Sequence, residues 1–494
     1  MPLILLIDFL VVYMLMVRIY SKGIEATLPL ATFVLVLLPE DAIIGLKVLG
    51  LTPQRLIIVT LGVAYLVMRR NPSVRSTSAA RTMKWFIILQ IVWGLWSTIF
   101  SIDPVASIKK LLAEAGEYYV LYAVFWHSIT DKRTIRQILV AMAGATAVAS
   151  VFGFSEAYWG WSVMDLFPVV MHRFHNGLPA VDIERGLRVQ ATFEHPILFG
   201  VALTLSIIII LYLLPDAQTT SQRLFLWTGL LLMVISSYKS SSRGPWLALI
   251  VSLALLFILD CRTRIPHIIV VGLVVLVLVV RPGIGDTLKT IYLNSLDTNT
   301  SEGSSFEYRS ALKTVAAHAL SRSPDRALWG YGLESFYALH LEGEFLGKPH
   351  AFLSCDNAWI EFMVETGYVG LAIMILLLGT PLVIAVRNSI GQPGSDTYLS
   401  RTLLIIITAY LMMMLGVGMY AWGQTGYMLW IMIALVIAHD RLLRRSQHNH
   451  KAKLRALAAS GRETGKDLIS VAGTYCTSAV KPWGGAGGCG EPNW

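Results

Sequence analysis

The sequence predicts an all-α protein that crosses a membrane many times, because of its composition and the spacing of its apolar runs. Apolar residues make up 55% of the 494-residue chain and charged residues only 14%, with a mean hydropathy of +0.62. Soluble domains carry about 25% charged residues. The apolar residues are grouped into long runs separated by polar connections, which is the pattern of membrane-spanning helices.

These runs predict about 12 or 13 transmembrane helices, several of them shorter than the roughly 20 residues that a perpendicular span needs. The runs are 3–16, 26–38, 56–68, 85–100, 111–126, 138–158, 197–214, 224–235, 247–259, 268–280, 369–386, 403–420 and 428–438. The first run starts without basic residues and without an evident small-residue cleavage site. We therefore interpret it as a retained span rather than a signal peptide.

Basic residues indicate the orientation of the chain. They are concentrated in connections that the positive-inside rule assigns to the cytoplasm: 69–84, 131–136, 261–264, 387–401 and from 441 onward. The C-terminus is then cytoplasmic, whereas the N-terminus is less constrained because Pro29 and Pro39 interrupt the first runs. Orientation and anionic membrane lipids explain the net charge of +9, so we predict no nucleic-acid partner.

The chain divides into an integral membrane domain, residues 1–440, and a tail, residues 441–494. Two connections on the outer side, 159–194 and 282–366, are too long for simple turns, and loops of this length are usually functional. The tail is basic and then glycine-rich, with too little apolar content to pack, so we expect it to be disordered. The spacing of the four cysteines supports neither a disulfide framework nor a zinc site.

Arginines on the outer side are the first candidates for a binding site. Arg243 lies in a short polar stretch between two apolar runs, where a cation is costly, so we predict that it binds an anionic ligand rather than a carboxylate of the bundle. Arg188, just before another run, offers planar donors to phosphate oxygens. His195 either titrates near neutrality in the same site or caps the helix that follows it.

The second outer connection is predicted to be partly helical. Ser304 to Glu307 match a capping box, and apolar residues follow at helical spacing: Leu312, Val315, Ala316 and Ala319. Arg309 and Lys313 are one turn apart on a different face. They either clasp a phosphate together or form a solvated basic face.

A carboxylate-rich segment leads into the run at 369–386. If helical, it places Asn357, Glu361 and Glu365 on one stripe, with Asp356 at its start. A carboxylate close to arginines can act as a general base towards a sugar hydroxyl. For Glu365, an ion pair with an arginine is an equally good interpretation.

In this order and spacing, the motifs resemble the O-antigen ligase and polymerase superfamily of bacterial envelope polysaccharide enzymes, over roughly residues 97–374. The matching features are Ser101 to Pro104 with Ser107, Arg188 with Phe193 to Pro196, Ser242-Arg243-Gly244, Tyr308-Arg309, Gly330-Tyr331-Gly332, and Asn357 through Glu365-Thr366-Gly367 to Gly370. Each motif is weak alone, and the specificity comes from their order, their spacing and their shared side of the membrane.

The resemblance implies a GT-C-like, multi-pass glycosyltransferase of the bacterial inner membrane whose active site faces the periplasm. Its donor would be an oligosaccharide on a polyprenyl diphosphate such as undecaprenyl diphosphate, and the site would need neither a nucleotide sugar nor a metal. The diphosphate would be held by Arg188, Arg243 and Arg309. Further substrate-binding candidates are His195, Asn357 and Lys313. The acceptor would be another lipid-linked glycan (O-antigen or exopolysaccharide polymerase), the lipid A core (lipopolysaccharide ligase) or a protein hydroxyl.

One position departs from that family's pattern. Its ligases usually carry a histidine eleven positions before the first glycine of the closing pair, and counting back from Gly367 reaches Asp356. An aspartate with the ordinary pKa of about 3.9 is a weak base at neutral pH unless its surroundings raise that value. The base therefore stays open among Asp356, His350 and Glu365, and the swap favours polymerase over ligase.

The alternative function is a transporter or flippase for polysaccharide or lipid-linked glycans. Such a protein would place charges near the bilayer midplane in broken helices and would show internal repeats. The sequence instead gathers its notable arginines on one side, beside a large loop, and shows no evident repeat.

Overall fold

The computed structural model describes residues 2–39, 44–45, 50–68, 77–166, 181–182, 186–260, 268–269, 272, 301–352, 355–390, 394–420 and 422–459. Most of these residues are helical, and their strands pair only into two-stranded antiparallel hairpins. The predicted run at 268–280 and the glycine-rich part of the tail lie largely outside the described residues.

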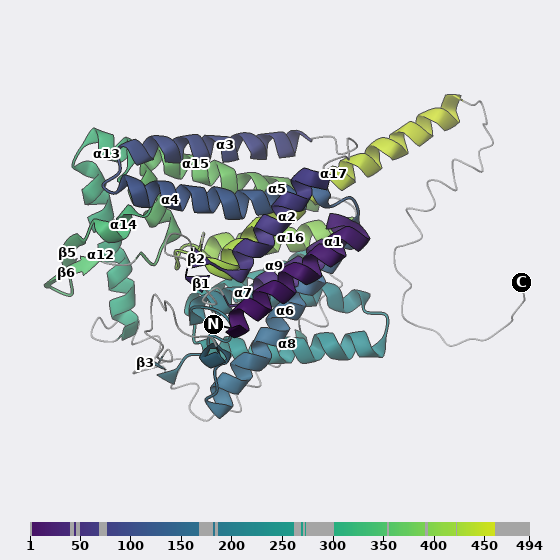
Figure 1. Cartoon of the computed structure of the whole chain (residues 1–494), viewed down its shortest axis with the longest axis horizontal. Coiled ribbons are helices and arrows are strands. Elements are labelled where there is room, and N and C mark those ends of the chain that lie inside the picture. Colours follow the sequence, from purple (N-terminus) through teal and green to yellow (C-terminus); the bar gives the residue numbers. More distant parts are fainter. Residues whose placement is uncertain are drawn as a thin grey trace, which may run out of the picture.

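Long helices lie side by side along one axis and form a bundle (Figure 1). The bundle helices are α1 (Pro2–Leu37), α2 (Pro53–Met68), α3 (Ser78–Ile99), α4 (Pro104–Glu114), α5 (Val120–Ser128), α6 (Lys132–Trp159), α7 (Pro196–Leu213), α8 (Thr220–Ser240), α9 (Arg243–Leu259), α15 (Ala358–Ser389), α16 (Ser395–Met413) and α17 (Gly423–Ala459). Short turns of other helix types are η1 (Ala115–Tyr119), η2 (Val163–Leu166) and η3 (Leu214–Asp216). Small hairpins pair β1 (Ile44–Gly45) with β2 (Gly50–Leu51), and β3 (Val181–Asp182) with β4 (Gly186–Leu187).

Within the described residues, five helices are long and apolar enough to cross a membrane: Ser78–Ile99, Lys132–Trp159, Pro196–Asp216, Ala358–Ser389 and Gly423–Lys453. The shorter helices Pro53–Met68 and Arg243–Leu259 are also apolar. The protein is therefore an all-α polytopic membrane protein, as the sequence predicts. The total of 12 or 13 spans stays a prediction.

Helices α7 and α17 lie at the centre of the bundle. Side chains on every face of α7 are buried, as expected for a helix that is apolar all round. Helices α6, α8, α9 and α16 pack against α7, and α5 and α16 pack against α17. The few polar groups of α7 find partners on its neighbours: Ser206 donates to Thr146 Oγ1 of α6 at 2.8 Å, and Thr204 donates to the carbonyl of Pro245 at 3.1 Å.

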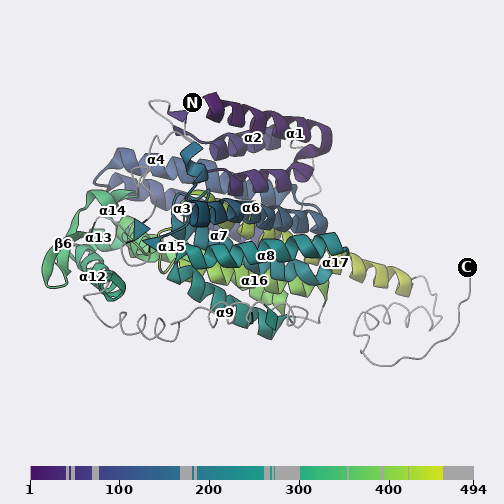
Figure 2. The ribbon, with the colours of Figure 1, turned by 90° about the horizontal axis from the view of Figure 1, so that it is seen from below.

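Residues 301–352 form a cap at one end of the bundle, opposite the end from which α17 projects (Figures 1 and 2). The cap contains α12 (Ser301–Ser321), α13 (Pro324–Trp329), α14 (Ser335–Ala338) and a hairpin of β5 (Leu341–Phe345) and β6 (Lys348–Phe352). The hairpin register pairs Leu341 with Phe352, and both side chains enter a small core with Leu312 and Ala316 of α12. The prediction of helix in this loop is confirmed.

The structure differs from the sequence predictions in three local features. Helix α12 begins at Ser301, so Ser304 to Glu307 lie inside it rather than at its cap. Helix α1 joins the first two predicted runs across a break at Gly23, where φ is +82°. Helix α17 continues to Ala459, so residues 441–459 are helical and not unstructured. The buried Asp440 supports this extension through ion pairs with Arg387 and, at 3.0 Å, with Arg444 one turn further along α17.

Candidate functional site

A cavity of about 490 Å³ lies between the cap and the end of the bundle. Its walls come from α4, the segment before α7, the α8–α9 turn, α12, α14, the start of α15 and the connection from α16 to α17. Arg188, Arg243 and Arg309 all line it, although they come from three distant parts of the chain.

Hydrogen bonds fix the position of Arg188 in the lining of the cavity. Arg188 donates from Nε to the carbonyl of Ser240 and from its terminal nitrogen to Ser242 Oγ, both at 3.2 Å. The following backbone N–H groups of Gln190 and Ala191 donate to the buried carboxylate of Glu156 at 3.1 and 2.9 Å. The segment that carries Arg188 is thereby fixed to α6 on one side and to the α8–α9 turn on the other.

Two helix N-termini open onto the same wall. Helix α9 begins at Arg243, two residues after the left-handed Ser241 (φ +49°), and its cap residue Ser242 makes no capping hydrogen bond to the first turn. Instead, Ser242 Oγ donates to the carbonyl of Pro196, the first residue of α7, at 3.2 Å. Helix N-termini carry unpaired N–H groups and a partial positive charge, so they favour anions. We call Arg188, Arg243, Arg309 and these two N-termini the cationic wall.

His195 has two roles in this wall. Its Nδ1 accepts a hydrogen bond from the Ile197 N–H at 3.1 Å, so it caps α7, and its ring also lines the cavity beside Trp422, with ring centroids 5.8 Å apart. His195 therefore caps α7 and also belongs to the cavity lining, and its titration stays a prediction.

The Nε donor of Arg309 is buried. Its Nε is shielded from solvent and makes no hydrogen bond with any residue that the structure describes. Leaving such a donor unpaired costs about 1–3 kcal/mol. A ligand oxygen in the cavity is a natural partner for it.

Carboxylates from the start of α15 face the same cavity. Asp356, Glu361 and Glu365 line it, and Glu365 is only 4% exposed. Asn357 does not line it, because its Oδ1 caps α15 by accepting from Trp359 N and Ile360 N at 2.9 and 3.2 Å. Burial raises the pKa of Asp356 above its ordinary value, an effect that the positive charge of Arg309 partly offsets. The aspartate is thus a stronger base than its residue type alone suggests.

A glycine contact sets the position of these carboxylates. Helix α15 breaks at Gly367 (φ +70°), where a Cβ would overlap the carbonyl of Leu328 in the cap. The break leaves backbone carbonyls that accept bonds from the cap: Val364 O from Tyr331 N at 3.0 Å, and Glu365 O from Gly332 N at 2.8 Å. The Gly330-Tyr331-Gly332 motif of the cap therefore packs directly against the segment of α15 that ends at Gly367.

The segment from Ser97 to Ser107 supports this contact by hydrogen bonds. Ile102 N donates to the carbonyl of Tyr331 at 3.1 Å, and Ser107 Oγ donates to the carbonyl of Leu333 at 2.7 Å. Ser97 Oγ, at the end of α3, lies 3.2 Å from the carbonyl of Glu365. The motif at 101–107 thus contributes to the site by supporting the cap.

The structure does not bring His350 or Lys313 to the cavity. His350 lies on β6 among the rings of Tyr308, Phe345 and Phe352, with centroids 5.9, 5.2 and 5.1 Å away, and faces a separate recess on the hairpin. Lys313 is exposed on α12 and is not among the cavity residues.

Sequence reasoning overlooked several cavity residues, among them Lys110, Glu114, Glu334 and Trp422. Lys110 and Glu114 flank the start of the apolar run at 111–126, and charge at the edge of a run is the signal that identified Arg243. Glu334 carries no such signal. Its position depends on a left-handed backbone (φ +62°) that directs it towards Lys110, whose Nζ lies 3.2 Å from its carboxylate.

Comparison with known families supports the resemblance noted in the sequence. Residues 228–375 match the model of a family described as O-antigen ligase. Over this segment the chain is similar to the O-antigen ligase family, which supports the resemblance to the O-antigen ligase and polymerase superfamily. The matched segment runs from α8 into α15 and includes Arg243, Arg309 and the carboxylates from Asp356 to Glu365, whereas Arg188 precedes it. A comparison with curated proteins finds no match.

Proposed function

We propose that this protein transfers an oligosaccharide from a polyprenyl diphosphate to a sugar hydroxyl at the periplasmic face of the inner membrane. The observation that carries the proposal is the cavity, which is lined both by arginines with helix N-termini and by a set of carboxylates. Several positive groups around one small volume suit a diphosphate, since guanidinium groups and helix N-termini both bind phosphate oxygens. The match of residues 228–375 to the O-antigen ligase family supports this activity at the level of reaction class.

The transfer would proceed by direct displacement. The acceptor oxygen attacks the anomeric carbon of the donor sugar, and the bond from that carbon to the diphosphate oxygen breaks. The electron pair stays on the polyprenyl diphosphate, whose growing charge Arg188, Arg243 and Arg309 stabilise. The hydroxyl proton passes to a carboxylate of the cavity and then to solvent.

We assign the role of general base to Asp356. It lines the cavity next to Arg309, so it would lie beside the diphosphate, and its raised pKa improves its ability to accept a proton. Glu365 is the second candidate, because it is buried in the same cavity. His350 is not retained as a base, because its ring faces the hairpin recess.

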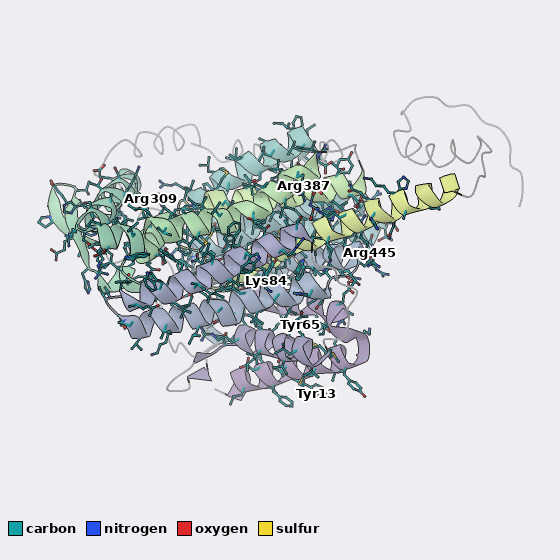
Figure 3. The ribbon with its side chains drawn as sticks, turned by 90° about the horizontal axis from the view of Figure 1, so that it is seen from above. Tyr13, Tyr65, Lys84, Arg309, Arg387 and Arg445 are labelled. Carbon is teal, nitrogen blue, oxygen red and sulfur yellow. The ribbon has the colours of Figure 1, made fainter. Side chains whose placement is uncertain are left out.

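The distribution of labelled basic residues supports the proposed orientation. Arg309 lies at the cap end, whereas Arg387 and Arg445 lie nearer the end from which α17 emerges (Figure 3). A cap in the periplasm therefore agrees with a cytoplasmic C-terminus. In a variant whose four native cysteines are serine, a membrane-impermeant maleimide should label Lys313→Cys in intact inner-membrane vesicles of periplasm-out orientation and spare Arg445→Cys. The reverse labelling would contradict the orientation.

The decisive experiment is a reconstituted transfer assay. Purified protein in nanodiscs is incubated with a polyprenyl-diphosphate oligosaccharide, with and without lipid A core. A ladder of glycans on the polyprenyl carrier indicates a polymerase, the product that the aspartate at position 356 favours, and a single shift of the core indicates a ligase. Failure to form either product, together with movement of the lipid-linked glycan across liposomes, would support transport instead. The position of Arg309 at the cap end, away from the middle of the bundle, supports transfer over transport.

A further inference from the structure

The cavity is also lined by a cluster of carboxyl groups around one lysine. Lys110 of α4 pairs with Glu334 at 3.2 Å and interacts electrostatically with three further glutamates: Glu114, Glu361 and Glu365. All five side chains line the cavity. We call these five residues the acidic wall.

Two of these carboxyl groups, Glu114 and Glu365, are buried within the electrostatic reach of Lys110. Glu114 is 3% exposed and Glu365 is 4% exposed, yet neither side chain makes a hydrogen bond or ion pair with a residue that the structure describes. A single ammonium group, already paired with Glu334, serves the whole cluster. Buried carboxylates are costly unless something in the cavity donates hydrogen bonds to them.

We infer that the acidic wall binds the acceptor sugar and selects one whose contacting residues are uncharged or carry an amine. This inference rests on the proposed function, in which the cationic wall is occupied by the donor diphosphate. Sugar hydroxyl and ammonium groups are donors, so they satisfy Glu114 and Glu365. A uronate, phosphate or sulfate on the acceptor brings a further negative charge into a wall that holds four carboxyl groups and only one ammonium group, and is rejected by repulsion.

The remaining residues of the cavity suit a sugar. The ring of Tyr337 is 44% exposed and lines the cavity beside Glu334, and Trp422 lines it beside His195. Aromatic rings provide flat apolar surfaces for the faces of sugar rings. Trp422 Nε1 donates to Glu194 Oε2 at 2.7 Å, which fixes the plane of its ring.

Binding of the acceptor is tested first without donor. The full-length protein in nanodiscs is titrated by calorimetry with three disaccharides: cellobiose, the disaccharide of glucosamine, and cellobiouronic acid. We expect the neutral and amine-bearing sugars to bind at least about tenfold more tightly than the acidic one, since like charges in a desolvated site repel strongly. Equal or tighter binding of the acidic sugar, or binding of none of the three, would overturn the inference.

Charge-neutral variants connect the preference to the acidic wall. Glu114→Gln and Glu334→Gln keep the shape of the side chain and should bring the neutral-to-acidic ratio to within about threefold, because each removes one repelling charge. Glu344→Gln is the matched control, since Glu344 is exposed on the β5–β6 hairpin outside this cavity, and it should leave the ratio unchanged. A ratio that survives both cavity substitutions contradicts the inference even if one variant folds poorly.

The same three sugars, linked to polyprenyl diphosphate, then serve as acceptors with a common donor. Transfer to the acidic acceptor at the rate of the neutral one would leave the proposed function standing and refute the selectivity. A binding preference without any transfer would leave the sugar site standing and refute the proposed function.

Discussion

Arg309 offers the sharpest test of the site, because it combines a buried donor with a carboxylate neighbour. Arg309→Ala removes a charge-assisted contact to the diphosphate. Losing one preorganised donor of this kind lowers turnover about 10²- to 10³-fold, or about 2.7–4 kcal/mol. The ligand-free protein should not lose stability through this contact, because the Nε donor has no protein partner to lose among the described residues.

A second effect of Arg309→Ala distinguishes catalysis from folding. The positive charge of Arg309 holds the pKa of Asp356 lower than burial alone would leave it. Without that charge the pKa rises further, so the acidic limb of the kcat/KM profile should move to higher pH. Arg309→Lys keeps the charge but loses the planar donors, so it should lower turnover while leaving the limb nearly in place.

The assay is the reconstituted transfer reaction, measured from pH 4.5 to about 8.5, the range in which a perturbed carboxyl group titrates. Lys313→Ala is the matched control, since Lys313 lies one turn along α12, is exposed and does not line the cavity. If Arg309→Ala stays within about threefold of the unsubstituted protein, a change too small for a charge-assisted contact, the assigned role is refuted. An acidic limb that does not move would separately refute the assignment of Asp356 as the base.

Three further predictions concern other parts of the site. Arg243→Ala should lower kcat/KM about 10²- to 10³-fold, whereas the exposed Arg322→Ala should leave it unchanged. Asp356→Asn should abolish transfer yet raise Tm near neutral pH. The reason is that an acid whose pKa is raised by folding makes folding less favourable as pH rises through that pKa. The increase in Tm should disappear at pH values below the ordinary aspartate pKa, where both forms are uncharged. Gly367→Ala should cost at least about 1–3 kcal/mol of stability through its left-handed backbone and the overlap with a cap carbonyl, whereas Gly379→Ala, in open space on the same helix, should not destabilise. Thermal unfolding in detergent checks the Tm and glycine predictions.

Much of the bundle could be predicted because its signals are local. An apolar run of sufficient length has few folded alternatives in a membrane protein, so the predicted runs and the observed helices agree for most of the described chain. Arg188, Arg243 and Arg309 could be singled out for a related reason. A cation near the apolar part of a membrane protein is energetically costly, and the residues that make it so are its neighbours in the sequence.

The rest of the site depends on non-local geometry. Glu334 and Lys110 are 3.2 Å apart only because a left-handed turn follows two glycines, which no periodicity encodes. His350 was a reasonable base by residue type, but the pairing of β6 with β5 directs its ring into a cluster of aromatic side chains. The helical part of the tail depends partly on a contact with another helix, because Asp440, which pairs with Arg444 one turn along α17, is also held by Arg387 of α15.

The contact between cap and bundle has a consequence for how the site responds to substitution. The cap is joined to α15 by backbone hydrogen bonds from Tyr331 and Gly332 to the carbonyls exposed at the Gly367 break. Asp356, Glu361 and Glu365 therefore keep a fixed register against Arg309 through main-chain geometry, independent of which side chains surround them. A cap that lifted away as a lid would break these bonds and displace base and arginine together. Substrate must then enter without opening this contact, so cysteine crosslinks between the cap and α15 should leave turnover intact, whereas a mobile lid would be inactivated by them.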